Sequence, residues 1–280
     1  MDARTIVAVD IGGTKIACGL VVMGESAPTV ESVVKVPTDA AQGGPAVLAR
    51  VIEQVRAAIE RSDCHPVGVG ISSAGVVDPR TGDITYANEI MPGWGGTHLA
   101  AEVTAAVGLP CCVLNDVHAH ALGEARWGGG RDKASCLVVA VGTGIGGAFV
   151  ERGSIMLGEH DEAGHIGHVC CADGSPMHGA EIDRRAAAGD PAAVAAEARA
   201  GRALGEVMGS MCNMLDPSCV ILSGSVAQCG PAWSDAMRAG FAEQAMPPVA
   251  TTPIIGGDLG GDAPLIGAAE NFVRSAYVEI

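Results

Sequence analysis

Aromatic residues are scarce in this chain of 280 residues. Phe, Trp and Tyr together make up 3% of the sequence, although hydrophobic residues as a whole reach 48%. The core must therefore be built mainly from Val, Ile, Leu and Ala, and the 40 glycines indicate many tight turns. A chain of this length also buries enough surface to fold without disulfide staples. The composition is typical of an aliphatic α/β enzyme.

Positive charge is equally limited. The chain has 17 Lys and Arg residues against 32 Asp and Glu residues, which gives a formal net charge of −15. Binding of nucleic acid or of an anionic membrane surface needs a basic face, so both are unfavourable for this protein. An anionic ligand must instead be held locally by a small group of residues.

Long hydrophobic runs are absent as well. The first apolar run, TIVAV, stops at Asp10, far short of a signal-peptide core, and no run approaches the roughly 20 apolar residues that a membrane span needs. The ten cysteines lie mostly inside apolar runs such as IACGL and PCCVL, which is typical of buried small side chains in a reducing compartment. We therefore expect a soluble, cytoplasmic protein without a disulfide framework.

Hydrophobic periodicity predicts two α/β halves, each opened by a strand, a glycine turn and a second strand. The first half continues with helices and strands at 45–62, 67–72, 98–110 and 111–116, and with a helix from Val117. The second half restarts the pattern at 134–155 and continues with segments at 190–215, 219–225, 232–245 and 252–257, and with a helix from about 265. The second opening segment is a weak internal repeat of the first.

Two glycine turns, DIGGTK (Asp10 to Lys15) and GTGIGG (Gly142 to Gly147), lie between these strands. Glycine lets the backbone approach an anion and point successive N–H groups at it, although one such turn can also be an ordinary tight hairpin. Two matching turns in corresponding halves favour phosphate binding. Neither turn opens a helix, which argues against both the dinucleotide fingerprint and the Walker pattern.

Five motifs in order and spacing resemble the ROK family of sugar kinases and sugar-responsive repressors, within the actin-like ATPase superfamily. They are VAVDIGGTK, NDVHAHALGE, VGTGIGG, AGHIGH and LDPSCVILSGSV, and they cover nearly the whole chain. The resemblance implies a two-lobed α/β fold of the ribonuclease H-like type with duplicated βββαβα halves. It also implies a small lobe at 1–115 for the sugar and one phosphate turn, joined by a helix at about 265–280. The large lobe, at 116–264, would bind the nucleotide and form a dimer.

The resemblance further assigns ATP and Mg²⁺ as the cofactors. It implies that Asp10 places the Mg²⁺ of ATP, which suits a carboxylate because Mg²⁺ prefers hard oxygen ligands. The expected nucleotide-binding residues are Gly12, Gly13, Thr14 and Lys15 in the first turn, Gly142, Thr143 and Gly144 in the second, and Gly224 in the SGSV turn. The sequence leaves polyphosphate open as an alternative phosphate donor.

Asp116 has two interpretations. It ends the strand CCVLND, where α/β folds present functional side chains, but it could also simply cap the helix that starts at Val117. The ROK resemblance implies that Asp116 is the catalytic base for the sugar hydroxyl and that Asn115 binds a neighbouring hydroxyl. It also implies sugar contacts at Gly75 and Asn88, both of which could instead be plain loop residues. His118 and His120 are expected at the surface.

The segment AGHIGHVCCADGSPMHGAE departs from the family pattern. Most ROK kinases have Glu-x-Gly-His here, followed by a cysteine loop that binds structural zinc, whereas this chain has His165 in place of the Glu and lacks the loop. His168 keeps its place, and we expect both histidines to contact the sugar, with a structural turn as the alternative. Glu181 is a candidate for the second family Glu. A substitute zinc site built from the remaining His and Cys residues (His165, His168, His178 and Cys170 or Cys171) lacks the paired spacing, so we expect no zinc.

The sequence therefore predicts an ATP-dependent kinase for the primary (6-) hydroxyl of a hexose or amino hexose, such as glucose or N-acetylmannosamine. Two alternatives stay open. One is a catalytically silent sugar-binding sensor or regulator of the same family, and the other is a kinase for a specialised amino sugar or cyclitol in secondary metabolism. A homodimer without nucleic-acid or membrane partners is expected.

Overall fold

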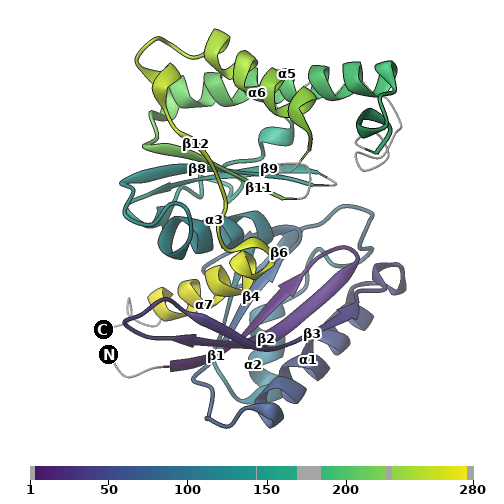
Figure 1. Cartoon of the computed structure of the whole chain (residues 1–280). Coiled ribbons are helices and arrows are strands. Elements are labelled where there is room, and N and C mark those ends of the chain that lie inside the picture. The colour runs from purple at the N-terminus through teal and green to yellow at the C-terminus, as the bar shows by residue number, and fades with distance from the viewer. Residues whose placement is uncertain (1–3, 143, 169–183, 225–228, 276–280) are drawn as a thin grey trace. The chain divides into compact units, whose positions relative to one another are not determined.

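The computed structural model describes residues 4–142, 144–168, 184–224 and 229–275, with the His168 side chain left out. The fold divides into two compact units (Figure 1). The first consists of the described residues of Met1–Gly128, Leu157–Glu162 and Gly261–Ile280, and the second of those of Gly129–Met156 and Ala163–Gly260. Candidate residues Thr143 and Glu181, with Cys170, Cys171 and His178, lie outside the described residues.

The first unit is built on a five-stranded sheet in the order β3-β2-β1-β4-β7. Its strands are β1 (Arg4–Ile11), β2 (Lys15–Met23), β3 (Thr29–Pro37), β4 (Val69–Ser73) and β7 (Cys111–Asn115). β1 pairs antiparallel with β2 and parallel with β4, and β4 pairs parallel with β7. A separate hairpin of β5 (Val76–Asp78) and β6 (Asp83–Tyr86) follows β4.

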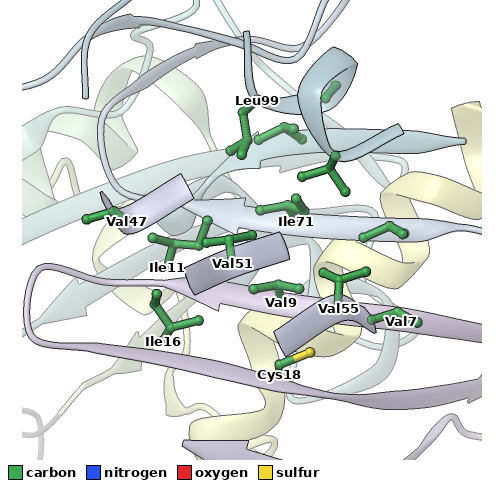
Figure 2. Packing of buried hydrophobic residues seen from close by; sticks show 14 of the residues in the cluster. Val7, Val9, Ile11, Ile16, Cys18, Val47, Val51, Val55, Ile71 and Leu99 are labelled. Carbon is green, nitrogen blue, oxygen red and sulfur yellow. The ribbon is translucent and has the colours of Figure 1, made fainter. Parts of the chain in front are cut away.

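Helices cover both faces of this sheet because alternate residues of β1 point to opposite sides. Val7, Val9 and Ile11 are buried against α1 (Gly44–Arg61) and α2 (Leu99–Val107), as Figure 2 shows for α1 and Leu99. Ile6 and Ala8 face α7 (Ala263–Ser275) on the other side. Such a two-sided sheet needs nearly continuous aliphatic strands, which is what the composition predicts.

Helix α3 (Asp116–Trp127) belongs to the first unit, since it packs closely against α7. The buried carboxylate of Glu270 on α7 accepts hydrogen bonds from Arg126 Nε at 3.1 Å and from Trp127 Nε1 at 2.9 Å. The division of the chain therefore falls at Gly128, one helix later than the expected lobe boundary after residue 115.

The second unit repeats the topology with a sheet in the order β10-β9-β8-β11-β12. Its strands are β8 (Ser135–Val141), β9 (Ile145–Glu151), β10 (Ser154–Ile155), β11 (Cys219–Ser223) and β12 (Ile254–Gly256). Helices α5 (Pro191–Leu215) and α6 (Pro231–Gln244) pack on each other and bury Leu204, Met208 and Met237 against β8 and β11. The predicted internal repeat is therefore present in the fold.

Four short 3-10 helices complete the described chain: η1 (Ala40–Gln42), η2 (Ile166–His168), η4 (Val249–Thr251) and η5 (Gly260–Asp262). Among the described cysteines none forms a disulfide; Cys18, Cys136, Cys212 and Cys219 are buried, whereas Cys64 is exposed. None of the helices in the described ranges has both the length and the hydropathy needed to span a bilayer.

Candidate active site

Three parallel strands of the first unit end at the same level. In their register Ile11 pairs with Ser73, and Ser73 pairs with Asn115. The residues that follow these strand ends therefore meet along one edge of the sheet, where open α/β folds present ligand-binding groups. The edge collects Asp10, the turn from Gly12 to Lys15, Gly75, Asn115 and Asp116, all of them candidates from the sequence.

The first glycine turn joins β1 to β2. The Gly12 N–H donates to the Lys15 carbonyl at 3.0 Å and closes the hairpin. Thr14 and Lys15 are exposed, and a Cβ placed on Gly13 would lie 3.2 Å from Ile90 Cγ2. No described residue accepts a hydrogen bond from the N–H of Gly13 or of Thr14. The turn thus presents backbone N–H groups to solvent, as a phosphate-binding turn must.

Asp10 is partly buried beside this turn, and Ser72 Oγ donates to its Oδ1 at 2.7 Å. Burial raises the pKa of the Asp10 carboxyl above its ordinary value because the charged form loses solvation. The Ser72 hydrogen bond and the positive charge of Lys15 lower this pKa by smaller amounts. A partly desolvated carboxylate at the strand end fits a divalent cation, since a hard oxygen ligand suits Mg²⁺ and the cation offsets the cost of the buried charge.

Asn115, not Asp116, caps helix α3. The Asn115 Oδ1 accepts hydrogen bonds from the N–H of Val117 at 3.0 Å and of His118 at 3.2 Å. The interpretation of Asp116 as a mere helix cap is therefore wrong, because Asp116 is already the first helical residue. Its Oδ1 accepts from Asn115 Nδ2 at 3.0 Å and from the Val117 N–H at 2.9 Å. A carboxylate in the first turn is also stabilised by the helix dipole.

Gly75 lies directly against Asn115. Its carbonyl accepts a hydrogen bond from Asn115 Nδ2 at 2.9 Å. Gly75 has φ +101°, and a Cβ there would come within 2.8 Å of the Tyr86 carbonyl oxygen, so this backbone requires glycine. The structure thus brings Gly75, Asn115 and Asp116 together.

Asn88 lies on an exposed loop, where its Oδ1 accepts a hydrogen bond from the Ile90 N–H at 3.2 Å. Trp94, which the sequence analysis did not single out, is fully buried and holds the end of this loop. Its Nε1 lies 3.2 Å both from Ser73 Oγ and from the Ala74 carbonyl oxygen. The PGW tripeptide was the signal that could have identified this anchor.

In the second unit, Gly142 and Gly144 lie in the turn between β8 and β9. The Gly142 N–H donates to the Gly144 carbonyl at 2.9 Å, and both residues are exposed. Gly224 follows β11 with φ +90°, and a Cβ there would approach the Val141 carbonyl oxygen to 2.3 Å. Gly224 is therefore fixed against the end of β8, next to Gly142.

His165 is exposed on a turn that packs against β9. The Gly147 N–H donates to the Gly164 carbonyl at 2.8 Å, and Ile166 is buried. His168 is the last residue of η2. Within the described ranges, no group of three or more His, Cys, Asp or Glu residues is arranged to hold a metal ion.

The expectation that His118 and His120 lie at the surface is wrong for His118, which is 2% exposed. His120 is partly buried, and burial lowers its pKa, while the charge of Glu124 acts in the opposite direction. Two positions apart on a helix, these side chains point in different directions, but α3 packs against α7 and also contacts β4 and β7, so a polar residue on it can be buried.

The ROK family model matches residues 6–179 and 171–274 of the chain. This chain belongs to the ROK family. The two matched stretches overlap at 171–179, within the segment AGHIGHVCCADGSPMHGAE.

Individual ROK proteins align along nearly the full length. The glucokinase of Streptomyces coelicolor is 27% identical over 317 residues, with 94% of this chain and 96% of the relative covered. The N-acetylmannosamine kinase of Yersinia pseudotuberculosis is 28% identical over 294 residues, with 94% and 96% covered. Among solved structures, a ROK glucokinase from Streptomyces griseus in complex with glucose and AMPPNP matches with a TM-score of 0.78 and 27% identity, covering 95% of this chain and 98% of that chain. The predicted actin-like α/β fold is confirmed.

Proposed function

We propose that this ROK protein transfers the γ-phosphoryl group of ATP to the primary 6-hydroxyl of a hexose or amino hexose. The chain is a carbohydrate kinase, as its glucokinase and N-acetylmannosamine kinase relatives indicate. The observation that carries the finer proposal is the Asp116 carboxylate, which Asn115 holds at the start of α3, on the same sheet edge as Asp10 and the first glycine turn.

Asp116 is the proposed general base. A carboxylate is far too weak a base to deprotonate a sugar alcohol in advance. Its task is to orient the hydroxyl and to take the proton late, in a loose transition state where positioning and charge neutralisation dominate. The hydrogen bond from Asn115 and the fixed start of α3 hold the carboxylate in one orientation.

Asp10 is the proposed carboxylate of the Mg²⁺ site, and Ser72 fixes its orientation through the 2.7 Å hydrogen bond. When bound, Mg²⁺ would neutralise charge on the phosphates of the nucleotide. The N–H groups of the turn from Gly12 to Lys15 add hydrogen bonds to those phosphates. In the second unit, roles of Gly142, Thr143, Gly144 and Gly224 in binding the nucleotide stay predictions.

The Asn115 side chain uses all its polar groups inside the protein, because Nδ2 donates to Gly75 and Asp116 while Oδ1 accepts two backbone N–H groups. This bonding supports a role in positioning Asp116. Direct contact of Asn115 with a sugar hydroxyl would require one of these bonds to be exchanged. Sugar contacts at Gly75, Asn88, His165, His168 and Glu181 also stay predictions.

The sugar is the open part of the proposal. Glucose is favoured by the Streptomyces glucokinase relatives, one of which has been solved in complex with glucose and AMPPNP. An amino sugar is favoured by the N-acetylmannosamine kinase relative and by the AGHIGH segment.

A catalytically silent sensor is disfavoured because Asp10, Asp116 and the first glycine turn are all present along one sheet edge. Dimer formation and ATP rather than polyphosphate as donor are further parts of the proposal.

The decisive experiment measures ATP consumption by the full chain with glucose, glucosamine, N-acetylglucosamine, N-acetylmannosamine and 3-amino-3-deoxyglucose. We expect turnover with at least one sugar, and Asp116→Asn should lower kcat about a hundredfold or more, as for the loss of a general base. Asp235→Asn, at an exposed position on α6, is the matched control and should leave kcat unchanged. Absence of turnover above the Asp116→Asn level on every sugar, with ATP or polyphosphate, would favour the silent sensor.

A further inference from the structure

Thr38 lies immediately behind the first glycine turn and is completely buried. Its Oγ1 donates a hydrogen bond to the Gly12 carbonyl at 2.6 Å, and its backbone N–H donates to the Thr14 carbonyl at 3.0 Å. One residue, just after β3, therefore binds two carbonyl oxygens of a turn that lies more than twenty positions earlier in the chain.

Thr38 is itself held from the opposite side by Arg50 of α1. The Arg50 guanidinium donates to the Thr38 carbonyl and, at 3.0 Å, to Gln42 Oε1. It also pairs with the Asp39 carboxylate at 3.5 Å. Asp39 has φ +49°, in the left-handed region that few non-glycine residues adopt, Asp among them. The segment behind the turn is thus fixed by several polar contacts at once.

These contacts decide where the N–H groups of the turn point. A trans peptide is planar, so its C=O and N–H point in opposite directions. Because the Gly12 and Thr14 carbonyls face Thr38, the N–H groups of Gly13 and Lys15 face away from it. The Gly12 N–H is already used by the Lys15 carbonyl. The N–H groups of Gly13 and Lys15 are therefore turned away from the buried Thr38 side chain.

We propose that Thr38, braced by Arg50, is a positioning residue that orients the N–H groups of the Gly12–Lys15 turn toward the phosphates of the nucleotide. This inference rests on the proposed function and adds a residue outside the glycine motif to the nucleotide site. Thr38 touches no substrate; its effect passes through the peptide planes of the turn.

The test compares Thr38→Val, which removes the Oγ1 bond but keeps the size and the backbone N–H, with Thr38→Ser, which restores a hydroxyl. Mg²⁺ with AMPPNP is the probe for equilibrium binding by calorimetry. We expect Thr38→Val to raise the nucleotide Kd and the KM for ATP about tenfold, as for the loss of one buried hydrogen bond. The KM for the sugar should change less than about twofold, and Thr38→Ser should recover most of the nucleotide affinity.

Ser135→Ala is the matched control, because it removes another largely buried hydroxyl that bonds to Ser218, in the second unit. It should lower the unfolding midpoint without changing the KM for ATP. Arg50→Met provides a second variant if Thr38→Val does not fold, and it should weaken AMPPNP binding about threefold through the loss of the Thr38 carbonyl contact.

The outcomes separate the two proposals. Wild-type affinity for AMPPNP in both the folded Thr38→Val and Arg50→Met variants would overturn the positioning role and leave the kinase proposal intact. An equal rise in the KM of ATP and sugar would also overturn it, since that result indicates general loosening. A wild-type chain that binds no Mg²⁺–AMPPNP would overturn both.

Discussion

In each unit the central strand of the sheet runs into a glycine turn, and the neighbouring parallel strand ends beside it in serine. In the first unit Asp10 pairs with Ser72, and at the equivalent register in the second unit Ala140 pairs with Ser223. The topology is the same, but the carboxylate is present once. The duplicated fold therefore supplies two backbone turns, but only the first has a carboxylate at this position, where the second has the methyl group of Ala140.

The two turns also differ in what holds them. Thr38 and Arg50 brace the first turn through its carbonyl groups. Around the second turn, a Cβ on Gly142 or Gly144 would meet nothing within 4 Å. The first turn is therefore preorganised by Thr38, which follows β3, and by Arg50 of α1, whereas the described contacts of the second come mainly from its own backbone.

The largest effect is expected for Asp10→Asn, which puts an uncharged side chain at the position that Ala140 occupies in the second unit. If Asp10 places Mg²⁺ as proposed, activity should fall about a hundredfold or more, because the neutral amide is a much weaker ligand for the cation that neutralises the phosphates. Burial raises the pKa of Asp10 in the folded chain, so the folded state binds its proton more tightly than the unfolded state does. The free energy of unfolding contributed by this group therefore falls as pH rises from the ordinary value of 3.8 through the raised one.

Asp10→Asn should consequently be more stable than the wild type at neutral pH, and this gain should shrink toward pH 3.8. Urea unfolding at several pH values, together with kcat, measures both effects. Unchanged turnover would remove Asp10 from the nucleotide site, and a loss of stability at neutral pH would contradict the cost assigned to its burial.

The next effect contrasts two glycines of the second unit. Gly224→Ala should lower the free energy of unfolding by about 1 to 3 kcal/mol, because φ +90° is strained for alanine and its Cβ would meet the Val141 carbonyl. Gly144→Ala should leave stability unchanged, since its Cβ has open space. A raised KM for ATP in Gly144→Ala, without a loss of stability, would indicate that Gly144 is needed for close approach of phosphate. Gly224, in contrast, is needed for backbone packing.

The last comparison is between a buried and an exposed glutamate on the helices of the two units, and the exposed one should give the smallest effect. Glu270→Gln should lower the free energy of unfolding by about 1 to 3 kcal/mol, because the buried carboxylate accepts charged and neutral hydrogen bonds from Arg126 and Trp127. Glu243→Gln on α6 should have no measurable effect, since both Glu243 and its partner Arg202 are largely exposed. Chemical denaturation of both variants checks this, and equal losses would contradict the role of burial.

Much of the fold was predictable because its strands are aliphatic and its turns contain glycine. Both predicted opening hairpins are present, but the second turn is shorter than predicted, because β9 begins at Ile145 and Gly146 and Gly147 pair with β8. β3 and the β5–β6 hairpin were not identified, since β3 is a half-exposed edge strand without a clean alternation of apolar residues. Burial of His118 was also missed, because the polarity of a residue does not show that another helix, here α7, packs over its own helix.

The sequence by itself determined the family, the two glycine turns and the carboxylates Asp10 and Asp116, because ordered motifs and backbone requirements are local properties of the chain. Only the tertiary structure decided that Asn115 is the cap of α3 and that Thr38 and Arg50 brace the first turn. These roles depend on which carbonyl and N–H groups come within hydrogen-bonding distance across strands and helices. That distance is set by sheet register and helix packing, which no single stretch of sequence encodes.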